Sequence, residues 1–338
     1  PEVSLTDARQ RRDEARKLLV SGVDPSELKQ QQKDQEQEHK DRELLTFRKV
    51  AEEWFSKNEP VWSASHIKTV RNRLEHDVFP VIGNRQIATV DRATIKNIMM
   101  TVAGRGAIET ADRVKQYCGQ ILRYALNLEY IEVNPANDLR DILPKREPGH
   151  HAALIEPDQL AGLLRAIDEY SGSFVVKKAL QLAPLFFVRP GELNKIEWSQ
   201  INFETAEWRY FVTKTKIHHI VPLASQAVAI LRELHAVTGT GRYVFPGYRT
   251  ASRPMTSEAL LAAIRRMGYS KDDMTTHGFR AIARTHLDET LSYRIDWIEA
   301  QSAHAVKDAN GRAYNRTTYL EDRRKMMQSW ADFLDGLK

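Results

Sequence analysis

The stretch THGFRAIARTHLDET, residues 276–290, decides the fold. Phe279, Ile282 and Leu287 recur at helical spacing, so this stretch predicts a helix. His277 and Arg280 lie three residues apart at its start, which places both side chains on one helix face. There they can converge on one phosphate group. The alternative interpretation is a solvated helix face that carries the same pair.

A second arginine lies upstream, in LFFVRPGELNKIEW at residues 185–198. Arg189 follows an apolar run and precedes Pro-Gly, after which a helical pattern begins with Glu192. A planar guanidinium suits two phosphate oxygens at once, so Arg189 is a candidate phosphate ligand. The alternative is a helix start with a surface ion pair between Arg189 and Glu192.

A hairpin is predicted between these two segments. Alternation from Trp208 to Val212, a polar segment at 213–219 and a second apolar run from Ile220 indicate two antiparallel strands. Lys214 lies near the tip, where a flexible ammonium can donate a proton to a leaving oxygen. An edge-strand charge that blocks further pairing is the alternative, and Lys216 fits it equally well.

The last polar candidates lie in IEAQSAHAVKDANGRAYNRTTYLEDRR, residues 298–324. His304 ends a helical pattern, and Tyr314 follows ten residues later across a loop. A phenol has an ordinary pKa of about 10, so it needs nearby positive charge or a base to act as a nucleophile at neutral pH. Tyr319 is a rival nucleophile, and the distance from His304 favours Tyr314.

These motifs, in this order, resemble those of the tyrosine recombinases, the phage integrase family. The likeness is greatest to integrases of satellite prophages and genomic islands, which repeat HGFRA, an Ala-His pair, AYNR and a tail similar to YLEDRRKMMQSWADFL at 319–334. It covers nearly the whole chain. One departure is that Phe186-Phe187 stands where the family often has Thr-Gly, so we expect a differently shaped turn before Arg189.

The resemblance implies a role for each polar residue. Tyr314 attacks the scissile phosphate and forms a 3′-phosphotyrosyl bond, while Arg189 and Arg280 hold the nonbridging oxygens. Lys214 protonates the departing 5′ oxygen. His277 serves as an acid, base or hydrogen-bond partner, and His304 donates a hydrogen bond to the phosphate. The implied catalytic set is therefore Arg189, Lys214, His277, Arg280, His304 and Tyr314.

The implied fold class is mainly α (α+β): a helical core-binding domain and a mostly helical catalytic domain with a small antiparallel sheet around residues 205–224. We expect these parts in order: 1–25, the end of an arm-type DNA-binding domain; 26–44, a polar linker; 45–137, a helical, SAM-like core-binding domain; 138–151, an interdomain linker; 152–323, the catalytic domain; 324–338, a C-terminal helix. The first part lacks the strands that precede it in the family, which suggests a truncated chain. The last helix has an apolar stripe that suits either packing in its own domain or docking on a neighbouring subunit.

Apolar stripes support the helical core-binding domain. They run through Phe47–Trp54, Ile67–Leu74 and Val114–Leu128, and each predicts a buried helix face. Basic residues beside the stripes and in the linker are candidate DNA-backbone contacts, with a solvated helix face as the alternative for each. The candidates are His66, Lys68, Arg71, Arg73, Arg113, Lys115, Arg123, Lys145, Arg146, His150 and His151.

Composition agrees with a DNA-binding enzyme. The net charge is +5 and the pI about 9.1, yet 45 acidic residues require any basic surface to be segregated. The single cysteine, Cys118, excludes an intrachain disulfide, no apolar stretch suits a membrane span, and no Cys/His spacing suits zinc. We expect a cytoplasmic protein at the bacterial nucleoid that uses no metal or cofactor.

The predicted function is cleavage and rejoining of DNA at specific sites, through phosphotyrosine intermediates and a Holliday junction, to integrate or excise a mobile element. Expected partners are double-stranded attachment-site DNA and further copies of the chain in a tetramer, together with a DNA-bending host factor and an excision factor. Two alternatives stay open: DNA relaxation of the type IB topoisomerase kind, and a catalytically silent DNA-binding regulator.

Overall fold

The computed structural model describes residues 4–22, 24–30, 33, 45–137, 139, 142–144, 152–213, 217–304 and 319–338. The chain divides into two compact units, Pro1–Pro148 and Gly149–Lys338, which we call the N-terminal and C-terminal units. Each has its own hydrophobic core. Within the described parts, no helix is both long enough and apolar enough to cross a membrane.

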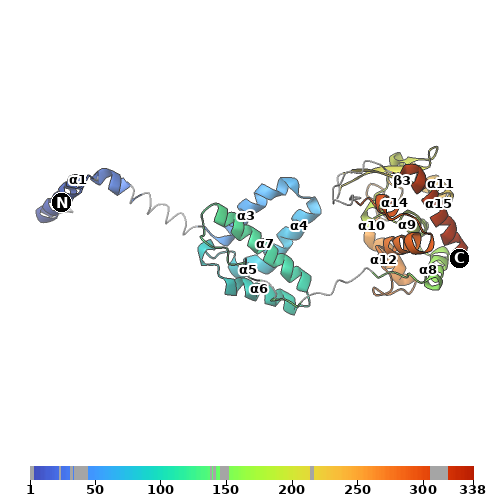
Figure 1. The fold of residues 1–338 in the computed structure, drawn as a ribbon, viewed down its shortest axis with the longest axis horizontal. Coiled ribbons are helices and arrows are strands. Elements are labelled where there is room, and N and C mark those ends of the chain that lie inside the picture. The colour runs from blue at the N-terminus through green and yellow to red at the C-terminus, as the bar shows by residue number, and fades with distance from the viewer. Residues whose placement is uncertain are drawn as a thin grey trace. The chain divides into compact units, whose positions relative to one another are not determined.

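The chain begins with helix α1, Leu5–Val20 (Figure 1). Gly22 follows it with a φ of 80°, a left-handed conformation that glycine adopts without strain. Leu19 and Val20 are exposed at the end of α1.

The N-terminal unit is a bundle of helices. Its helix α3 is capped by Thr46, whose hydroxyl accepts a hydrogen bond from the backbone N–H of Lys49. Ser63 and Asp91 cap two later helices in the same way. The elements are α3 (Phe47–Asn58), η1 (Glu59–Val61), α4 (Ala64–Arg73), the π-helical turn η2 (Leu74–Val78), α5 (Phe79–Ile82), η3 (Ile87–Thr89), α6 (Arg92–Gly104) and α7 (Ile108–Asn127).

The three predicted apolar stripes form the core of this unit, with two differences at the edges. The stripes on α3 and α7 are buried along nearly their whole length, and Val70 and Leu74 of the middle stripe are buried as well. Ile67 is only half-buried. Leu128 is 41% exposed because α7 ends one residue before it, so the helical register no longer turns its side chain inward.

The C-terminal unit is mostly helical with one small sheet, as predicted. Its elements are α8 (Pro157–Glu169), α9 (Phe174–Phe186), α10 (Pro190–Leu193), η4 (Trp198–Gln200), β1 (Ile201–Asn202), β2 (Glu207–Val212), β3 (Ile217–Pro222), α11 (Ser225–Thr238), α12 (Ser257–Arg266), α13 (Gly278–Thr285), the π-helical turn η5 (His286–Thr290), α14 (Ile295–Gln301) and α15 (Leu320–Leu337). A single core cluster contains residues from most of them.

The sheet is antiparallel with strand order β1-β2-β3. Tyr210 pairs with His219, and the hairpin closes with Val212 opposite Ile217. The second strand therefore begins three residues earlier than the sequence suggests, and His218 and His219 belong to β3 rather than to the turn. Pairing across the ladder outweighs the polar character of this histidine pair.

Helix α15 packs against its own unit (Figure 1). Met326, Met327, Trp330 and Leu334 are buried, and the indole N–H of Trp330 donates a 2.9 Å hydrogen bond to the carbonyl oxygen of Pro184 in α9. Of the two interpretations of the terminal stripe, this packing favours the first. Docking of this face on another subunit would require Trp330 to leave the core.

Candidate active site and DNA-contact residues

Arg189 is fixed by an ion pair at the start of α10. Its Nη1 lies 2.9 Å from Oε1 of Glu192, and its backbone N–H donates to Oε2 of the same carboxylate at 3.1 Å. The hydroxyl of Tyr210 donates to that Oε2 from β2 at 2.9 Å. Burial, and then the charge of Glu192, raise the pKa of Tyr210 far above its ordinary value, so it remains a hydrogen-bond donor. The ion pair predicted as an alternative thus exists, but it is largely buried and orients the arginine.

The turn before Arg189 has the conformation that glycine would allow. Phe187 ends α9 with φ 36° and ψ 35°, in the left-handed region where an L side chain is strained. Its ring is 1% exposed and contacts the Trp330 ring edge-to-face, with centroids 6.4 Å apart. Burial of the aromatic ring offsets the backbone strain. The chain therefore uses a phenylalanine to make a left-handed turn that glycine would make without strain, and the expected difference from the family's turn stays a prediction.

Arg280 is held by main-chain carbonyl groups. It is buried in α13, with Nη1 donating to the oxygen of Phe187 and Nη2 to that of Ser302, both at 3.0 Å. Burial lowers the pKa of Arg280, and the positive charge of Arg189 lowers it further. The two guanidinium groups are therefore near enough to repel one another. Such a pair suits an anion that would relieve the repulsion.

His304 lies between a cation and a carboxylate. Its Nε2 is 3.0 Å from Nη2 of Arg280, and its Nδ1 is 2.5 Å from Oε2 of Glu299. Because a guanidinium can only donate, Nε2 of His304 accepts and Nδ1 carries the proton. Arg284 donates to the other oxygen of Glu299 at 3.0 Å. Burial by itself would raise the pKa of Glu299, but the hydrogen bonds from His304 and Arg284 outweigh it and lower the pKa.

His277 is the residue immediately before α13, and it is half-buried. The backbone N–H of Arg280 donates to its carbonyl oxygen at 3.1 Å, so the predicted helical start is present. Gly278 between them is required by close packing, because a Cβ there would lie 2.4 Å from the carbonyl oxygen of Ala152. The close approach of Gly278 to the backbone of Ala152 packs the start of α13 against the first described residues of the C-terminal unit.

A buried group of residues that sequence reasoning missed, His219, Gln301 and Arg323, supports this site through hydrogen bonds. His219 on β3 donates from Nε2 to the carbonyl oxygen of Gln301 at 3.1 Å. Arg323 of α15, 2% exposed, donates to the side-chain oxygen of Gln301 and to the carbonyl oxygen of Ile220. Burial lowers the pKa of Arg323 to about 10. These bonds tie α15 and β3 to the end of α14, next to the Ser302 carbonyl that holds Arg280.

The structure therefore brings Arg189, Arg280 and His304 together and places His277 one turn from Arg280. Lys214 and Tyr314 lie outside the described residues, as do Lys145, Arg146, His150 and His151 of the predicted DNA contacts. Tyr319 is described: it precedes α15 with a left-handed φ of 44° and lies near Arg294, whose pKa it helps to raise after Asp296. The catalytic roles stay predictions.

In the N-terminal unit, one open groove collects several of the predicted DNA contacts. It lies between α3, α4 and α7 and has a volume of about 550 Å³. His66, Arg113 and Arg123 line it, together with Lys57, which sequence reasoning did not select. Amide and aromatic side chains complete its walls: Asn58, Gln116, Gln120, Asn127, Trp54, Trp62, Tyr117 and Tyr124. Among these described lining residues none is acidic.

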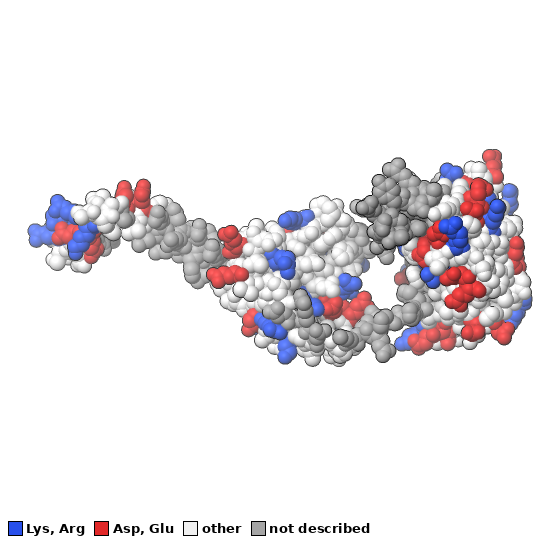
Figure 2. Space-filling model, viewed as in Figure 1, with Lys and Arg blue, Asp and Glu red and all other residues white. Residues whose placement is uncertain are grey.

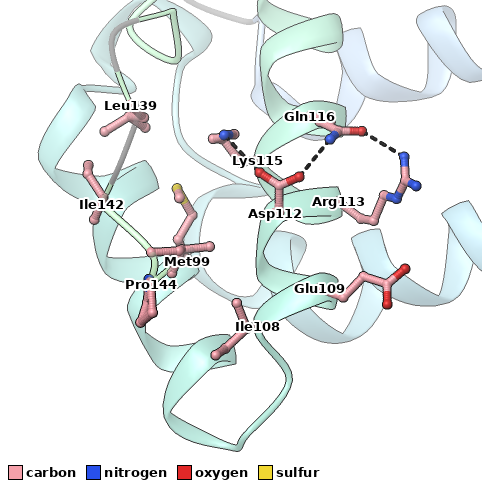
Figure 3. A pocket seen from close by; sticks show the side chains of 11 residues that line it. Met99, Ile108, Glu109, Asp112, Arg113, Lys115, Gln116, Leu139, Ile142 and Pro144 are labelled. Carbon is pink, nitrogen blue, oxygen red and sulfur yellow. Dashed lines mark hydrogen bonds and ion pairs between the residues drawn. The ribbon is translucent and has the colours of Figure 1, made fainter. Parts of the chain in front are cut away.

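Two other predicted contacts in this unit have protein partners instead. Arg71 lies over the Phe55 ring and 3.8 Å from Glu52. Lys115 forms a 2.8 Å ion pair with Asp112 in a different pocket, beside apolar residues of α6 and of the segment after α7 (Figure 3). These pairs make both residues weaker candidates for DNA contact.

The remaining two predicted contacts lie on α4. Lys68 is exposed, and Arg73 donates at 3.4 Å to the hydroxyl of Tyr117, a residue that lines the groove.

Charge is mixed over the visible face of the C-terminal unit, where lysine and arginine alternate with aspartate and glutamate (Figure 2). This face carries no block of one sign. Among the described residues, no group of three histidine, cysteine, aspartate or glutamate side chains is placed to hold a metal ion.

Comparison with known proteins identifies the family. Residues 47–142 match the phage integrase central domain, and residues 153–321 match the phage integrase family. Prophage integrase IntZ of Escherichia coli (strain K12) is 36% identical over 343 residues, a match that covers 100% of this chain and 82% of the relative. The integrase of Enterobacteria phage P4 is 35% identical over 351 residues, covering 99% of this chain and 78% of the relative.

Solved structures share the fold. A lambda integrase tetramer bound to a Holliday junction matches with a TM-score of 0.64 at 17% identity, covering 81% of each chain. The Tn1549 transposon integrase in complex with transposon right end DNA matches with a TM-score of 0.60 at 14% identity, covering 83% of this chain and 98% of the other. With matches that extend over nearly its whole length, the chain belongs to the phage integrase family and is a tyrosine-type site-specific DNA recombinase.

Proposed function

We propose that the chain cleaves and rejoins duplex DNA at attachment sites, integrating or excising a mobile element through a 3′-phosphotyrosine bond to Tyr314 and a Holliday junction. Each phosphodiester is conserved as an ester of the tyrosine, so strand transfer needs no ATP. The relatives are integrases, which does not favour the topoisomerase and silent-regulator alternatives.

The arginine pair is the observation that carries this proposal. Arg189 and Arg280 are oriented before any phosphate arrives, one by Glu192 and the other by the carbonyl groups of Phe187 and Ser302. Preorganised donors stabilise the charge that develops on a pentacoordinate phosphate, and removal of one such donor typically slows a reaction by about 10²- to 10³-fold. No described residue accepts a hydrogen bond from Nε of Arg280, so this N–H is available to a phosphate oxygen.

Arg189 and Arg280 together form what we call the phosphate clamp, and the other roles follow from the chemistry around it. His304 donates to a nonbridging oxygen once the phosphate replaces Arg280 beside its Nε2 and that nitrogen takes a proton from solvent. Glu299 keeps the ring oriented through Nδ1. His277 acts as an acid, a base or a hydrogen-bond partner at the same phosphate. Lys214 protonates the leaving 5′ oxygen.

DNA binding by both units completes the proposal. Residues 45–137 would act as the core-binding domain, contacting the DNA backbone through the basic groove lined by His66, Arg113 and Arg123. Residues 138–151 would link it to the catalytic domain at 152–323, with residues 1–25 as the end of an arm-binding domain. The lambda integrase tetramer bound to a Holliday junction and the Tn1549 integrase in complex with transposon DNA support assembly of four chains on two sites. This assembly would form at the nucleoid, where a DNA-bending host factor and an excision factor would join it.

Covalent trapping tests the reaction. A nicked duplex that carries the attachment site of the element releases its short strand after cleavage, so the enzyme stays linked to DNA. We expect peptide mapping to find the adduct on Tyr314 and Tyr314→Phe to form none. An adduct on Tyr319 would contradict the assignment of the nucleophile, and no adduct on any residue would contradict the proposed reaction.

The role of Lys214 has a separate test. We expect Lys214→Ala to slow cleavage of the ordinary substrate, and a 5′-bridging sulfur to restore the rate because a thiolate leaves without protonation. Equal loss on both substrates would exclude Lys214 as the general acid. Lys216→Ala is the matched control, since it changes a neighbouring lysine of the same polar segment, 213–219.

A further inference from the structure

A short loop in the C-terminal unit, residues 247–253, is closed and preformed. Pro246 and Pro254 face each other in an antiparallel bridge at its base, and Gly247 donates to the carbonyl oxygen of Arg253 at 2.8 Å. At Gly247 a Cβ would lie 3.2 Å from the carbonyl oxygens of Arg253 and Thr250, which shows how closely the loop folds on itself. The loop therefore has a defined shape before it meets a partner.

The three largest side chains of the loop are exposed. Tyr248 is 100% exposed, whereas Phe245 just before the loop is fully buried and anchors its base. Arg249 and Arg253 are exposed on either side of the tip. A rigid loop that holds a large aromatic ring wholly in water is an arrangement suited to contact with another molecule.

The charge of this segment is of one sign. The sequence has no aspartate or glutamate between Glu233 and Glu258. Within the part of the chain that the structure describes, neither Arg249 nor Arg253 forms an ion pair. By contrast, the nearby Arg242 lies 2.7 Å from Glu197. Two unneutralised guanidinium groups four residues apart suit the regularly spaced phosphates of a polyanion.

The loop is joined to the segment that carries Arg189. The backbone N–H of Val244 donates to the carbonyl oxygen of Ile196 at 2.9 Å, and Nδ2 of Asn194 donates to the hydroxyl of Ser257 at 2.9 Å. Asn194 and Ile196 directly follow the short helix α10 that begins after Arg189. Hydrogen bonds on both sides of the loop thus connect its base to the phosphate clamp.

We propose that residues 247–253 form a DNA-backbone contact loop, in which Arg249 and Arg253 bind phosphates beyond the cleaved one and Tyr248 packs against the sugar edge. The proposal rests on the proposed function, because it takes duplex DNA as the partner. It adds a DNA-binding surface in the C-terminal unit that is separate from the groove in the N-terminal unit.

Salt-dependent binding of the full chain tests the loop. Fluorescence anisotropy with a short labelled duplex of mixed sequence gives the slope of log affinity against log salt, and each phosphate contact contributes about 0.9 to that slope. We expect the double variant Arg249→Ala/Arg253→Ala to lose about 1.8 of the slope. Arg266→Ala is the matched control, an exposed arginine at the far end of α12, and its slope should equal that of the wild type.

The outcomes separate the two proposals. If the wild type does not bind the duplex, the proposed function itself fails. If the wild type binds and the double variant keeps the wild-type slope, only the loop proposal is overturned, and Arg249→Glu/Arg253→Glu repeats that test with a stronger perturbation. We expect Tyr248→Ala, but not Tyr248→Phe, to weaken binding several-fold at unchanged slope. Wild-type affinity in Tyr248→Ala would overturn the aromatic contact.

Discussion

His219 should make the C-terminal unit sensitive to acid. The ring is 6% exposed on β3, and its Nε2–H donates to the carbonyl oxygen of Gln301. Burial, followed by the positive charge of Arg323, lowers the pKa of His219 from 6.5 to about 3. The substitution His219→Gln keeps a neutral N–H donor of similar reach and removes the titrating ring.

The sign and size of the change in unfolding free energy with pH follow from proton linkage. The folded state keeps His219 neutral, while the unfolded state binds a proton below about pH 6.5, so its stability contribution is complete above that pH and is lost as the pH falls toward 3. One pKa unit corresponds to about 1.4 kcal/mol. Between pH 7 and pH 5 the wild type should therefore lose about 2 kcal/mol more unfolding free energy than His219→Gln.

Guanidinium chloride unfolding at pH 7 and pH 5, at one ionic strength, measures the difference. Other titrating groups act alike in both proteins, so the comparison isolates His219. His218→Gln is the matched control, because it changes the exposed neighbour on the same strand and should follow the wild type. If His219→Gln loses as much stability between the two pH values as the wild type does, the reasoning is refuted.

Two further predictions concern residues that support the clamp. Tyr210→Phe removes the hydroxyl that donates to Glu192 and keeps the ring. We expect single-turnover cleavage to slow about tenfold, as for the loss of one hydrogen bond to a charged group, while the melting temperature stays near that of the wild type. An unchanged cleavage rate would contradict an orienting role for Tyr210. Arg323→Ala strands the buried oxygens of Gln301 and Ile220 and leaves a cavity, so it should lower the unfolding free energy by about 3–5 kcal/mol. Arg323→Met removes the same hydrogen bonds but preserves volume, so it should lower the unfolding free energy less; equal losses in denaturant titrations would show that the hydrogen bonds, not the packing, dominate.

The sequence predicts the helices and the arginine pair because their signals are local. Apolar periodicity places the faces of α3 and α7, and the HxxR spacing fixes Arg280 at the first turn of α13. Boundaries are less certain: Leu128 continues the periodicity of α7, yet the helix stops before it. Only the turn geometry after Asn127 decides that end.

The supporting residues have no local signal. Tyr210 and His219 meet only because the β2–β3 register pairs them, and Glu299 acquires a role from its contact with His304 across the end of α14. Arg323, in a charged run of the sequence, is buried by the packing of α15. Long-range contacts of this kind cannot be deduced from spacing along the chain.

The same limit applies to the candidate DNA contacts: charge alone did not distinguish Arg113 and Arg123, which line the groove, from Lys115, which pairs with Asp112.

Phe187 makes the geometry of the candidate active site depend on the hydrophobic core. Its carbonyl oxygen holds Arg280, and its ring contacts Trp330 of the C-terminal helix. Glycine at this position would relax the backbone and remove the ring, while any other L residue would keep the strain. Substitutions in α15 that move Trp330 should therefore be transmitted to Arg280 without touching a polar residue. Selection for altered recombination rates can act on this apolar helix as well as on the residues that contact DNA.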